Sequence, residues 1–237
     1  MSGRLGPPSR SQVEKAGSQL RKIRRGEKPP ETLEACLEII ERHRQTHARP
    51  MLNANIGMRR YAQELGIEAQ VTQRLKRMQT IIEKLTERES GMNLARMRDI
   101  GGVRVVVDDL DALRRVQEKV TARRRRNGIE TIDYVAEPRQ SGYRAVHLIC
   151  MYSGKGVIRP VEVQLRTPAM HSWAVMVEEV SARLGVNHKQ DGYTPFHAWA
   201  LLWSRRLEAA ELGRPSNVSD EEFAAAWNAM KKGWWPA

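Results

Sequence analysis

The sequence contains little cysteine and no long apolar run. Its two cysteines, Cys36 and Cys150, fall in a helix-like and a strand-like segment. This favours free buried thiols over a disulfide, and no cysteine cluster suggests zinc. No run approaches the ~20 apolar residues of a membrane span, and the N-terminus lacks the apolar core of a secretory signal. We therefore expect a cytoplasmic protein that does not bind membranes.

Positive charge, in contrast, is abundant. The 237 residues, enough for an enzyme, carry a formal net charge of +12. Half of this charge lies in residues 1–30, whose eight basic residues, two acidic residues and four prolines predict a basic flexible or weakly helical arm. A second basic run spans residues 123–126. Such runs are either solvated surface or attract nucleotides and nucleic acid by long-range electrostatics.

Helical periodicity dominates the first half of the chain. Apolar residues recur at helical spacing in residues 31–48 and again in residues 72–90, so both segments are predicted as helices. In the first, His43 and His47 stand four residues apart without a nearby acidic or cysteine partner, which favours ordinary surface or core histidines over metal ligands. In the second, Arg77, Lys84 and Arg88 would line one edge, either as a solvated flank or facing an anion.

The second half predicts a sheet. The Gly101–Gly102 pair leads into a valine-rich strand and then a helix, and further strands are expected at about 130–135, 143–152 and 157–166, the last two joined by an "SGKG" hairpin. We predict an α+β fold in which helices flank a mixed, mainly antiparallel sheet. Residues 31–190 would form this domain, including a helical N-terminal extension, between the basic flexible arm (residues 1–30) and a C-terminal helical extension (residues 191–237).

Polar residues alternate with apolar ones along two of these strands. Glu162, Gln164 and Arg166 share one face of "VEVQLRT", and Tyr143 and His147 share a face of the preceding strand. Such a face costs free energy to bury and is unusual on a sheet flanked by helices, so it predicts a polar cleft. If Asp99 adds a second carboxylate, two carboxylates facing a row of cations suit magnesium-dependent phosphoryl transfer.

Four segments resemble consecutive motifs of the RelA/SpoT nucleotidyltransferase domain, over residues ~70 to 180. They are "RLKRMQTIIEKLTER", "MRDIGGVRVVV", "DYVAEPRQSGYRAVHL" and "VEVQLRTPAMHSWAVMVEE". The upstream stretch "PMLNANIGMRRYAQEL" and the form "HSWAVMVEE" within the fourth segment resemble stand-alone small alarmone synthetases, a subgroup that includes toxic members of toxin–antitoxin pairs. The resemblance implies a nucleotidyltransferase-like fold and transfer of the β,γ-pyrophosphate of ATP to the 3′-hydroxyl of GDP or GTP, which makes (p)ppGpp and releases AMP.

The resemblance also implies a role for each matching residue. Asp99 and Glu162 would bind Mg²⁺, and Glu162 would accept the proton of the attacking hydroxyl. Arg74 and Arg104 would stack on the adenine of ATP. The other cations would bind its phosphates: Lys76, Arg77, Lys84 and Arg88. The acceptor would lie on Tyr143, surrounded by Arg139, His147, Gln164 and Arg166.

The chain departs from the family pattern near the acceptor. Ile132 and Arg139 stand where the family often has lysine, so one cation is missing or replaced. There is also no His-Asp pair, which implies a synthetase without the family's metal-dependent hydrolase activity.

Two alternatives stay open at this point. The same ATP chemistry could modify the 3′ end of tRNA and block translation, which would suit the basic segments. The chain could also be a catalytically idle RNA- or partner-binding relic. Expected partners are therefore ATP, GDP/GTP or tRNA, an antitoxin protein and a second copy of the chain. Trp199 and Trp203 are expected to pack in the core or to contact such a partner.

Overall fold

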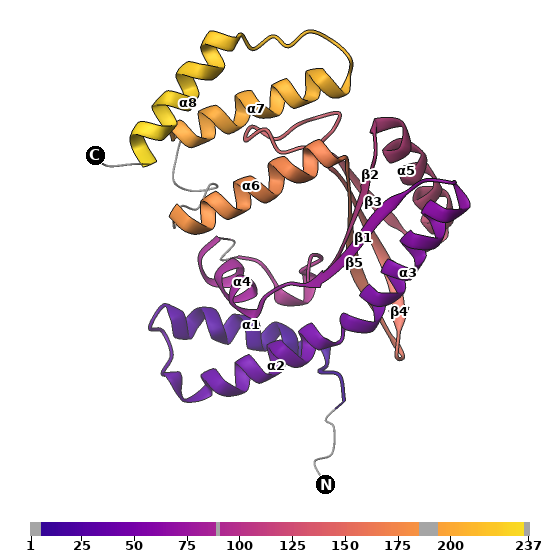
Figure 1. Cartoon of the computed structure of the whole chain (residues 1–237). Helices are drawn as coiled ribbons and strands as arrows, with labels where there is room; N and C mark the ends of the chain where they lie inside the picture. The colour runs from indigo at the N-terminus through magenta and orange to yellow at the C-terminus, as the bar shows by residue number, and fades with distance from the viewer. Residues whose placement is uncertain (1–5, 89–90, 185–193, 235–237) are drawn as a thin grey trace.

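A five-stranded sheet forms the centre of the computed structural model, which describes residues 6–88, 91–184 and 194–234 (Figure 1). The strand order is β1-β2-β5-β4-β3. The strands are β1 (Ala69–Leu75), β2 (Gly101–Val107), β3 (Ile129–Asp133), β4 (Val146–Gly154) and β5 (Val157–Arg166). Only β2 and β5 pair in parallel, while the other three pairings are antiparallel. The predicted α+β fold with a mixed, mainly antiparallel sheet is confirmed.

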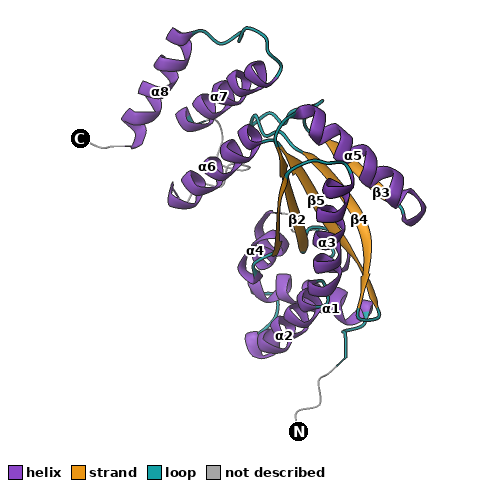
Figure 2. Cartoon of the chain, turned by 45° about the vertical axis from the view of Figure 1, so that its right-hand side comes forward, coloured by secondary structure: helices purple, strands orange, loops and turns teal. Residues whose placement is uncertain are grey.

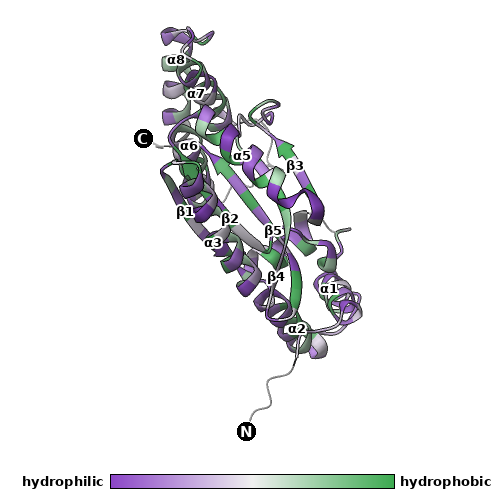
Figure 3. Ribbon diagram, turned by 90° about the vertical axis from the view of Figure 1, so that its right-hand side faces the viewer, coloured by the Kyte–Doolittle hydropathy of each residue, from purple (hydrophilic) through white to green (hydrophobic). Residues whose placement is uncertain are grey.

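One face of the sheet is apolar because hydrophobic residues alternate along the strands, a pattern visible along β5 in Figure 3. Val103, Val163 and Leu148 lie on this face and are at most 1% exposed. They belong to a core cluster that includes side chains of α3 (Ala48–Glu64) and α5 (Leu110–Arg124). Helices α6 (Pro168–Leu184) and α4 (Met78–Glu83) lie on the other side of the sheet (Figure 1). The opposite face of the strands is therefore the one available for polar side chains.

The predicted hairpin is confirmed. Lys155 and Gly156 join β4 to β5, and both have positive φ angles, 50° and 74°. Such a two-residue turn matches the twist of antiparallel strands. The two cysteines are free and buried, as expected.

The helix predicted for residues 72–90 is wrong in its first part. Residues 72–75 belong to β1, an edge strand that pairs antiparallel with β2. Helical structure begins only at α4 and continues as the π-helical turn η2 (Lys84–Arg88). Pairing with β2 overrides the local helical spacing, because strand preference depends on the neighbouring strand more than on intrinsic propensity. Arg77 consequently occupies the N-cap position of α4 instead of lying on the same helix edge as Lys84.

Of the two structures predicted for the basic arm, flexible or weakly helical, the flexible one is wrong for residues 10–24. They form α1 (Arg10–Arg24), which begins with a Ser9–Gln12 capping box. Its apolar side buries Val13, Ala16 and Leu20 in a second core cluster. Helix α1 packs against α2 (Leu33–Gln45) and, as Figure 1 shows, lies beside α4. The basic residues occupy the other side of an ordinary amphipathic helix.

Replacing Leu20 with Ala should lower the free energy of unfolding by about 2–5 kcal/mol, because the side chain is 2% exposed and its loss leaves a cavity. The exposed Lys22, replaced with Ala, should change it by no more than about 0.5 kcal/mol. Urea unfolding of both variants measures the difference. Equal stabilities would show that α1 does not pack in solution.

His43 and His47 are core residues. They are 7% and 1% exposed, and their rings meet edge to face with centroids 5.0 Å apart. Within the described residues no group of three or more His, Cys, Asp and Glu side chains could hold a metal. Burial is the main cause that lowers the pKa of His43 to about 3 and that of His47 to about 4. Both rings are therefore neutral in the folded protein.

Acid should destabilise the protein through these histidines. Their folded pKa values lie below the unfolded value of about 6.5, so the unfolded chain takes up protons first and stability falls as pH drops through that value. Between pH 7.5 and 5.5 the expected loss is about 2–3 kcal/mol, measured by urea unfolding. The double variant His43→Gln/His47→Gln should lose most of this dependence, and an undiminished loss would contradict the assignment.

The remaining helices, α7 (Pro195–Glu211) and α8 (Asp220–Trp234), lie beyond α6, at the end of the molecule opposite α1 and α2 (Figure 2). Trp199 stacks on Trp203 with ring centroids 5.4 Å apart and contacts Phe223 and Trp227. Trp199 thus joins a third core cluster, which Trp203 packs against. None of the described helices has the length and apolarity needed to cross a bilayer.

Candidate active site

Strand register brings the predicted polar residues into one row. Arg104 on β2 pairs with Gln164 on β5, and Gln164 pairs with His147 on β4. Glu162 and Arg166 flank Gln164 at positions two residues away, so they share its face. This is the face turned away from the apolar core. The polar face predicted from the alternation along β5 is confirmed, and His147 on β4 shares it. The strand predicted to begin at residue 143 begins only at Val146, so Tyr143 lies in the loop before β4.

Five side chains on this face close a ring of hydrogen bonds. Glu162 Oε1 lies 3.0 Å from His147 Nδ1, and its Oε2 accepts from Gln164 Nε2 at 2.7 Å. His147 Nε2 lies 2.6 Å from the hydroxyl of Tyr143. Arg166 Nη2 donates both to Tyr143 (2.9 Å) and to Gln164 Oε1 (3.0 Å).

The donors and acceptors of the ring can be assigned without conflict. Arg166 can only donate, so Tyr143 and Gln164 accept from it. The tautomer of His147 with hydrogen on Nδ1 then accepts from Tyr143 and donates to Glu162. Every hydrogen bond of the ring thus runs from Arg166 toward Glu162, which is the terminal acceptor.

These contacts keep Glu162 ionised. Burial acts to raise its pKa, but hydrogen bonds from His147 and Gln164 outweigh this and leave the pKa below its usual value. The negative charge of Asp99 acts on the same carboxyl in the raising direction, so the two carboxylates are close enough to interact. Glu162 is therefore a deprotonated, hydrogen-bonded carboxylate at neutral pH.

Asp99 lies between two lysines. Its Oδ2 is 3.1 Å from Lys76 Nζ, which follows β1, and 3.0 Å from Lys84 Nζ in η2. Burial acts to raise the pKa of Asp99, and the two positive charges lower it below its usual value. Its Oδ1 is buried and has no hydrogen-bond partner among the residues that the structure describes. One oxygen of an ionised carboxylate is therefore free for another ligand.

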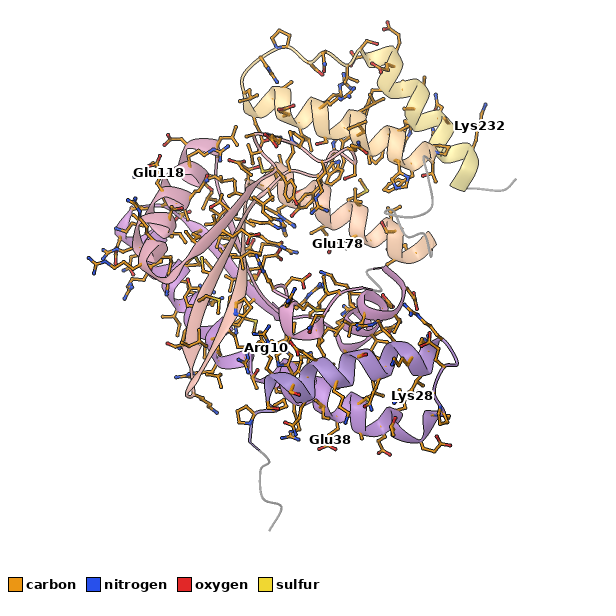
Figure 4. The ribbon with its side chains drawn as sticks, turned by 180° about the vertical axis from the view of Figure 1, so that it is seen from behind. Arg10, Lys28, Glu38, Glu118, Glu178 and Lys232 are labelled. Atoms are coloured by element: carbon orange, nitrogen blue, oxygen red, sulfur yellow. The ribbon has the colours of Figure 1, made fainter. Side chains whose placement is uncertain are left out.

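Arginines crowd the region between the sheet and α6. Burial lowers the pKa of Arg104, and the charges of Arg166 and Arg74 lower it further, while Glu178 on α6 acts in the opposite sense (Figure 4). Arg104 Nε and two nitrogens of Arg166 are buried without a partner in the described part of the chain. Because unpaired buried donors are costly, these groups fit a site that an anionic or hydrogen-bonding ligand completes.

Other predicted residues lie in different surroundings. Arg139 is exposed and sits over the Tyr134 ring, with its Cζ 4.4 Å from the centroid and 5.8 Å from that of Tyr143. Arg77 is exposed at the start of α4. The side chain of Arg88 lies outside the described part of the structure.

Two residues of the site were not predicted. Tyr134 contacts the rings of Tyr143 and His147 edge to face, with centroids 5.8 and 5.3 Å away. His171, in the first turn of α6, has a pKa lowered first by burial and then by Arg104 and Arg166. Tyr134 stands in the quoted "DYVAEPRQSGY" segment and could have been named from it. His171 lies in α6, and its proximity to Arg104 and Arg166 depends on how that helix packs, which the local sequence does not reveal.

Comparison with known proteins gives consistent matches. The family described as "Region found in RelA / SpoT proteins" matches residues 73–190. GTP pyrophosphokinase YjbM of Bacillus subtilis is 31% identical over 172 residues, which cover 69% of this chain and 78% of that protein. The bifunctional (p)ppGpp synthase/hydrolase SpoT of Escherichia coli is 34% identical over 145 residues, 61% of this chain but 20% of that much longer protein.

Solved structures agree with the sequence matches. Small alarmone synthetase 1 of Bacillus subtilis, bound to its product pppGpp, superposes with a TM-score of 0.55 and 25% identity, covering 69% of this chain and 90% of that chain. A GTP pyrophosphokinase family protein from Streptococcus pneumoniae superposes with a TM-score of 0.56 at 23% identity, covering 75% and 93% of the two chains. The fold is thus shared with alarmone synthetases.

Proposed function

Because this chain belongs to the RelA/SpoT family, we propose that it is an ATP pyrophosphokinase that transfers the β,γ-pyrophosphate of ATP to the 3′-hydroxyl of GDP or GTP, forming (p)ppGpp. The observation that carries the proposal is the hydrogen-bonded ring that ends on an ionised Glu162 beside Asp99. Support also comes from the similarity to YjbM along 78% of its length. The matching segment contains the synthetase motifs and no His-Asp pair, so we infer synthesis without hydrolysis.

Glu162 is the proposed general base. The 3′-oxygen of the acceptor attacks the β-phosphorus of ATP, and the bond from that phosphorus to the α–β bridging oxygen breaks to release AMP. The proton of the hydroxyl passes to Glu162, which the ring keeps deprotonated and oriented. His147 and Gln164 fix the carboxylate by hydrogen bonds at 3.0 and 2.7 Å.

The carboxylates also fit a magnesium ion. Asp99 and Glu162 supply the hard oxygen ligands that Mg²⁺ prefers, and no described residue forms a hydrogen bond with the buried Asp99 Oδ1. When bound, the ion would polarise the phosphate oxygens of ATP and offset their charge. Phosphates and water would complete its coordination, since Mg²⁺ sites of this kind use one or two carboxylates.

The cations would bind ATP on the β1–β2 side of the face. Lys76 and Lys84 hold their positive charges beside Asp99, where phosphates would lie. Arg74 and Arg104 are close enough to interact electrostatically and would stack on the adenine from two sides. Arg77 and Arg88 are the further cations proposed for the phosphates.

The acceptor would lie at the β4 end of the face. Tyr143 is half-buried and anchored through its hydroxyl, so its ring could serve as a platform for the guanine base. Arg139 over the neighbouring Tyr134 ring and Arg166 behind Tyr143 would bind its phosphates and sugar. Ile132 pairs with His147 across β3 and β4, so the expected lysine is replaced by an apolar side chain in this row.

Labelled transfer tests the proposal. The protein is incubated with Mg²⁺, γ-labelled ATP and one acceptor at a time: GDP, GTP or bulk tRNA. We expect label in GDP and GTP products. Label in tRNA alone would overturn the proposed acceptor in favour of tRNA modification, and no label in any acceptor would leave only the non-catalytic relic.

Two arginines of the second basic run that motivated the tRNA alternative contact the fold. Arg124 lies over the Tyr152 ring, with Cζ 3.8 Å from its centroid, and Arg123 lies 3.5 Å from Glu64. Their helix α5 covers the apolar face of the sheet, opposite Glu162. These contacts favour a free nucleotide acceptor. Self-association and an antitoxin partner are further proposals from the family resemblance, and sedimentation of the pure protein tests the first.

A further inference from the structure

Helix α7 contacts the acceptor side of the site although it lies outside the segment that matches the family. We propose that α7 positions the acceptor platform, and that Ser204 and Glu211 are positioning residues that hold Tyr143 and Arg166 in the orientation the acceptor base requires. This inference rests on the proposed function, because it takes Tyr143 as the surface on which the base lies.

The first tether holds the residue before Tyr143. Ser204 Oγ donates to the carbonyl oxygen of Gly142 at 2.5 Å, and Ser204 is 5% exposed. Gly142 has a φ of +86°, and a Cβ added there would lie 3.0 Å from Ser204 Cβ and 3.3 Å from Leu201 Cα. Glycine is needed both for this backbone conformation and for the close approach of α7. The helix therefore sits directly against the chain that carries Tyr143.

The second tether holds the residue after Tyr143. Arg144 Nη1 donates to Glu211 Oε2 at 2.5 Å, and the two side chains are 4% and 12% exposed. The other oxygen of Glu211 accepts from the hydroxyl of Thr167, the residue that follows Arg166 at the end of β5. One carboxylate of α7 thus joins the loop of Tyr143 to the strand that carries Glu162 and Arg166.

A third contact supports the ring of Tyr143 from the side. Trp173 of α6 donates from Nε1 to the carbonyl oxygen of Ala200 in α7 at 2.7 Å. The Trp173 ring lies 6.3 Å from that of Tyr143, centroid to centroid. Tyr143 accordingly packs against the third core cluster, to which α6, α7 and α8 all contribute.

The loop around Tyr143 needs such support. Residues 136–145 form no strand or helix, and their own backbone contributes short turns such as the bond from Gly142 N to Arg139 O at 2.8 Å. A segment with few internal hydrogen bonds moves unless outside contacts fix it. Helix α7 fixes the loop through its contacts with Gly142 and Arg144, the residues before and after Tyr143. The ATP side of the face, at β1 and β2, is held by other elements. Loosening α7 should therefore weaken acceptor binding more than ATP binding.

Steady-state kinetics of two variants test this selectivity. Ser204→Ala removes the bond to Gly142, and Glu211→Gln removes the charge that pairs with Arg144 while keeping its shape. For each we expect KM for GDP to rise about three- to tenfold, as the loss of one buried hydrogen bond implies, and KM for ATP to change less than about twofold. Because loss of a buried ion pair can destabilise the fold, Ser204→Ala is the decisive variant if Glu211→Gln unfolds.

Arg206→Ala is the matched control. Arg206 also lies in α7, but its ion pair with Asp220 and its contact with Phe223 point to α8. Its loss should leave both KM values unchanged. If Ser204→Ala raises both KM values equally, or lowers only kcat, α7 has a general structural role and the inference is overturned. An unchanged KM for GDP overturns it too. If the wild-type protein transfers to no acceptor, the proposed function fails instead, so the two failures are distinguishable.

Discussion

Replacing Glu162 with Gln should lower the rate of pyrophosphate transfer by about 10²–10⁴-fold while ATP binding stays close to that of the wild type. Gln keeps the size of the side chain and can still accept one hydrogen bond from the ring, so the fold and the row of cations are preserved. It cannot take a proton from the 3′-hydroxyl, and it removes one negative oxygen ligand from the proposed magnesium site. Labelled transfer under single-turnover conditions measures the rate, and equilibrium dialysis measures ATP binding.

Glu130→Gln provides the matched control for this change. Glu130 on β3 lies in the same row across the sheet, since it pairs with Ile149, which pairs with Glu162. Its side chain is 50% exposed and forms an ion pair with Arg98 at the surface. The variant should transfer at the wild-type rate. Near-normal transfer by Glu162→Gln would refute the role of Glu162, and equal losses in both variants would point to a general charge effect.

Replacing Asp99 with Asn should lower transfer by about 10²-fold or more at millimolar Mg²⁺, a loss of several kcal/mol of charge stabilisation. The carboxylate compensates Lys76 and Lys84, which both lie about 3 Å from Oδ2. Without its charge, two cations face each other in a partly buried position and the proposed metal loses a ligand. A titration with Mg²⁺ should show that the variant needs a higher concentration than the wild type for half-maximal rate.

Asp108→Asn is the control for Asp99. Asp99 shortly precedes β2 and Asp108 directly follows it, so the two lie at opposite ends of the same strand, and Asp108 is exposed. This variant should retain the wild-type rate and Mg²⁺ dependence. An unchanged Mg²⁺ requirement in Asp99→Asn would show that Asp99 does not bind the metal, even if the rate falls.

The sheet and its polar face were predictable from the sequence. β-branched residues and strict alternation identified β2, β4 and β5, and the period of two placed Glu162, Gln164 and Arg166 on one side. The failures share one physical cause. β1 is an edge strand that β2 stabilises, and α1 is a helix whose apolar side is covered by α2 and α4. In both, contacts with residues distant in sequence outweigh the local pattern, which is helical spacing in β1 and prolines and charges around α1.

The sequence by itself determined which side chains share a face, because side-chain direction along a strand depends only on the order of residues. It also carried the motifs on which the family resemblance depends. Only the tertiary structure decided that Asp99 lies between Lys76 and Lys84, that five polar side chains close a ring on Glu162, and that Ser204 and Glu211 hold the loop of Tyr143. Those contacts join residues from separate elements. Their distances depend on how the strands pair and the helices pack, and the spacing of residues along the sequence does not determine either.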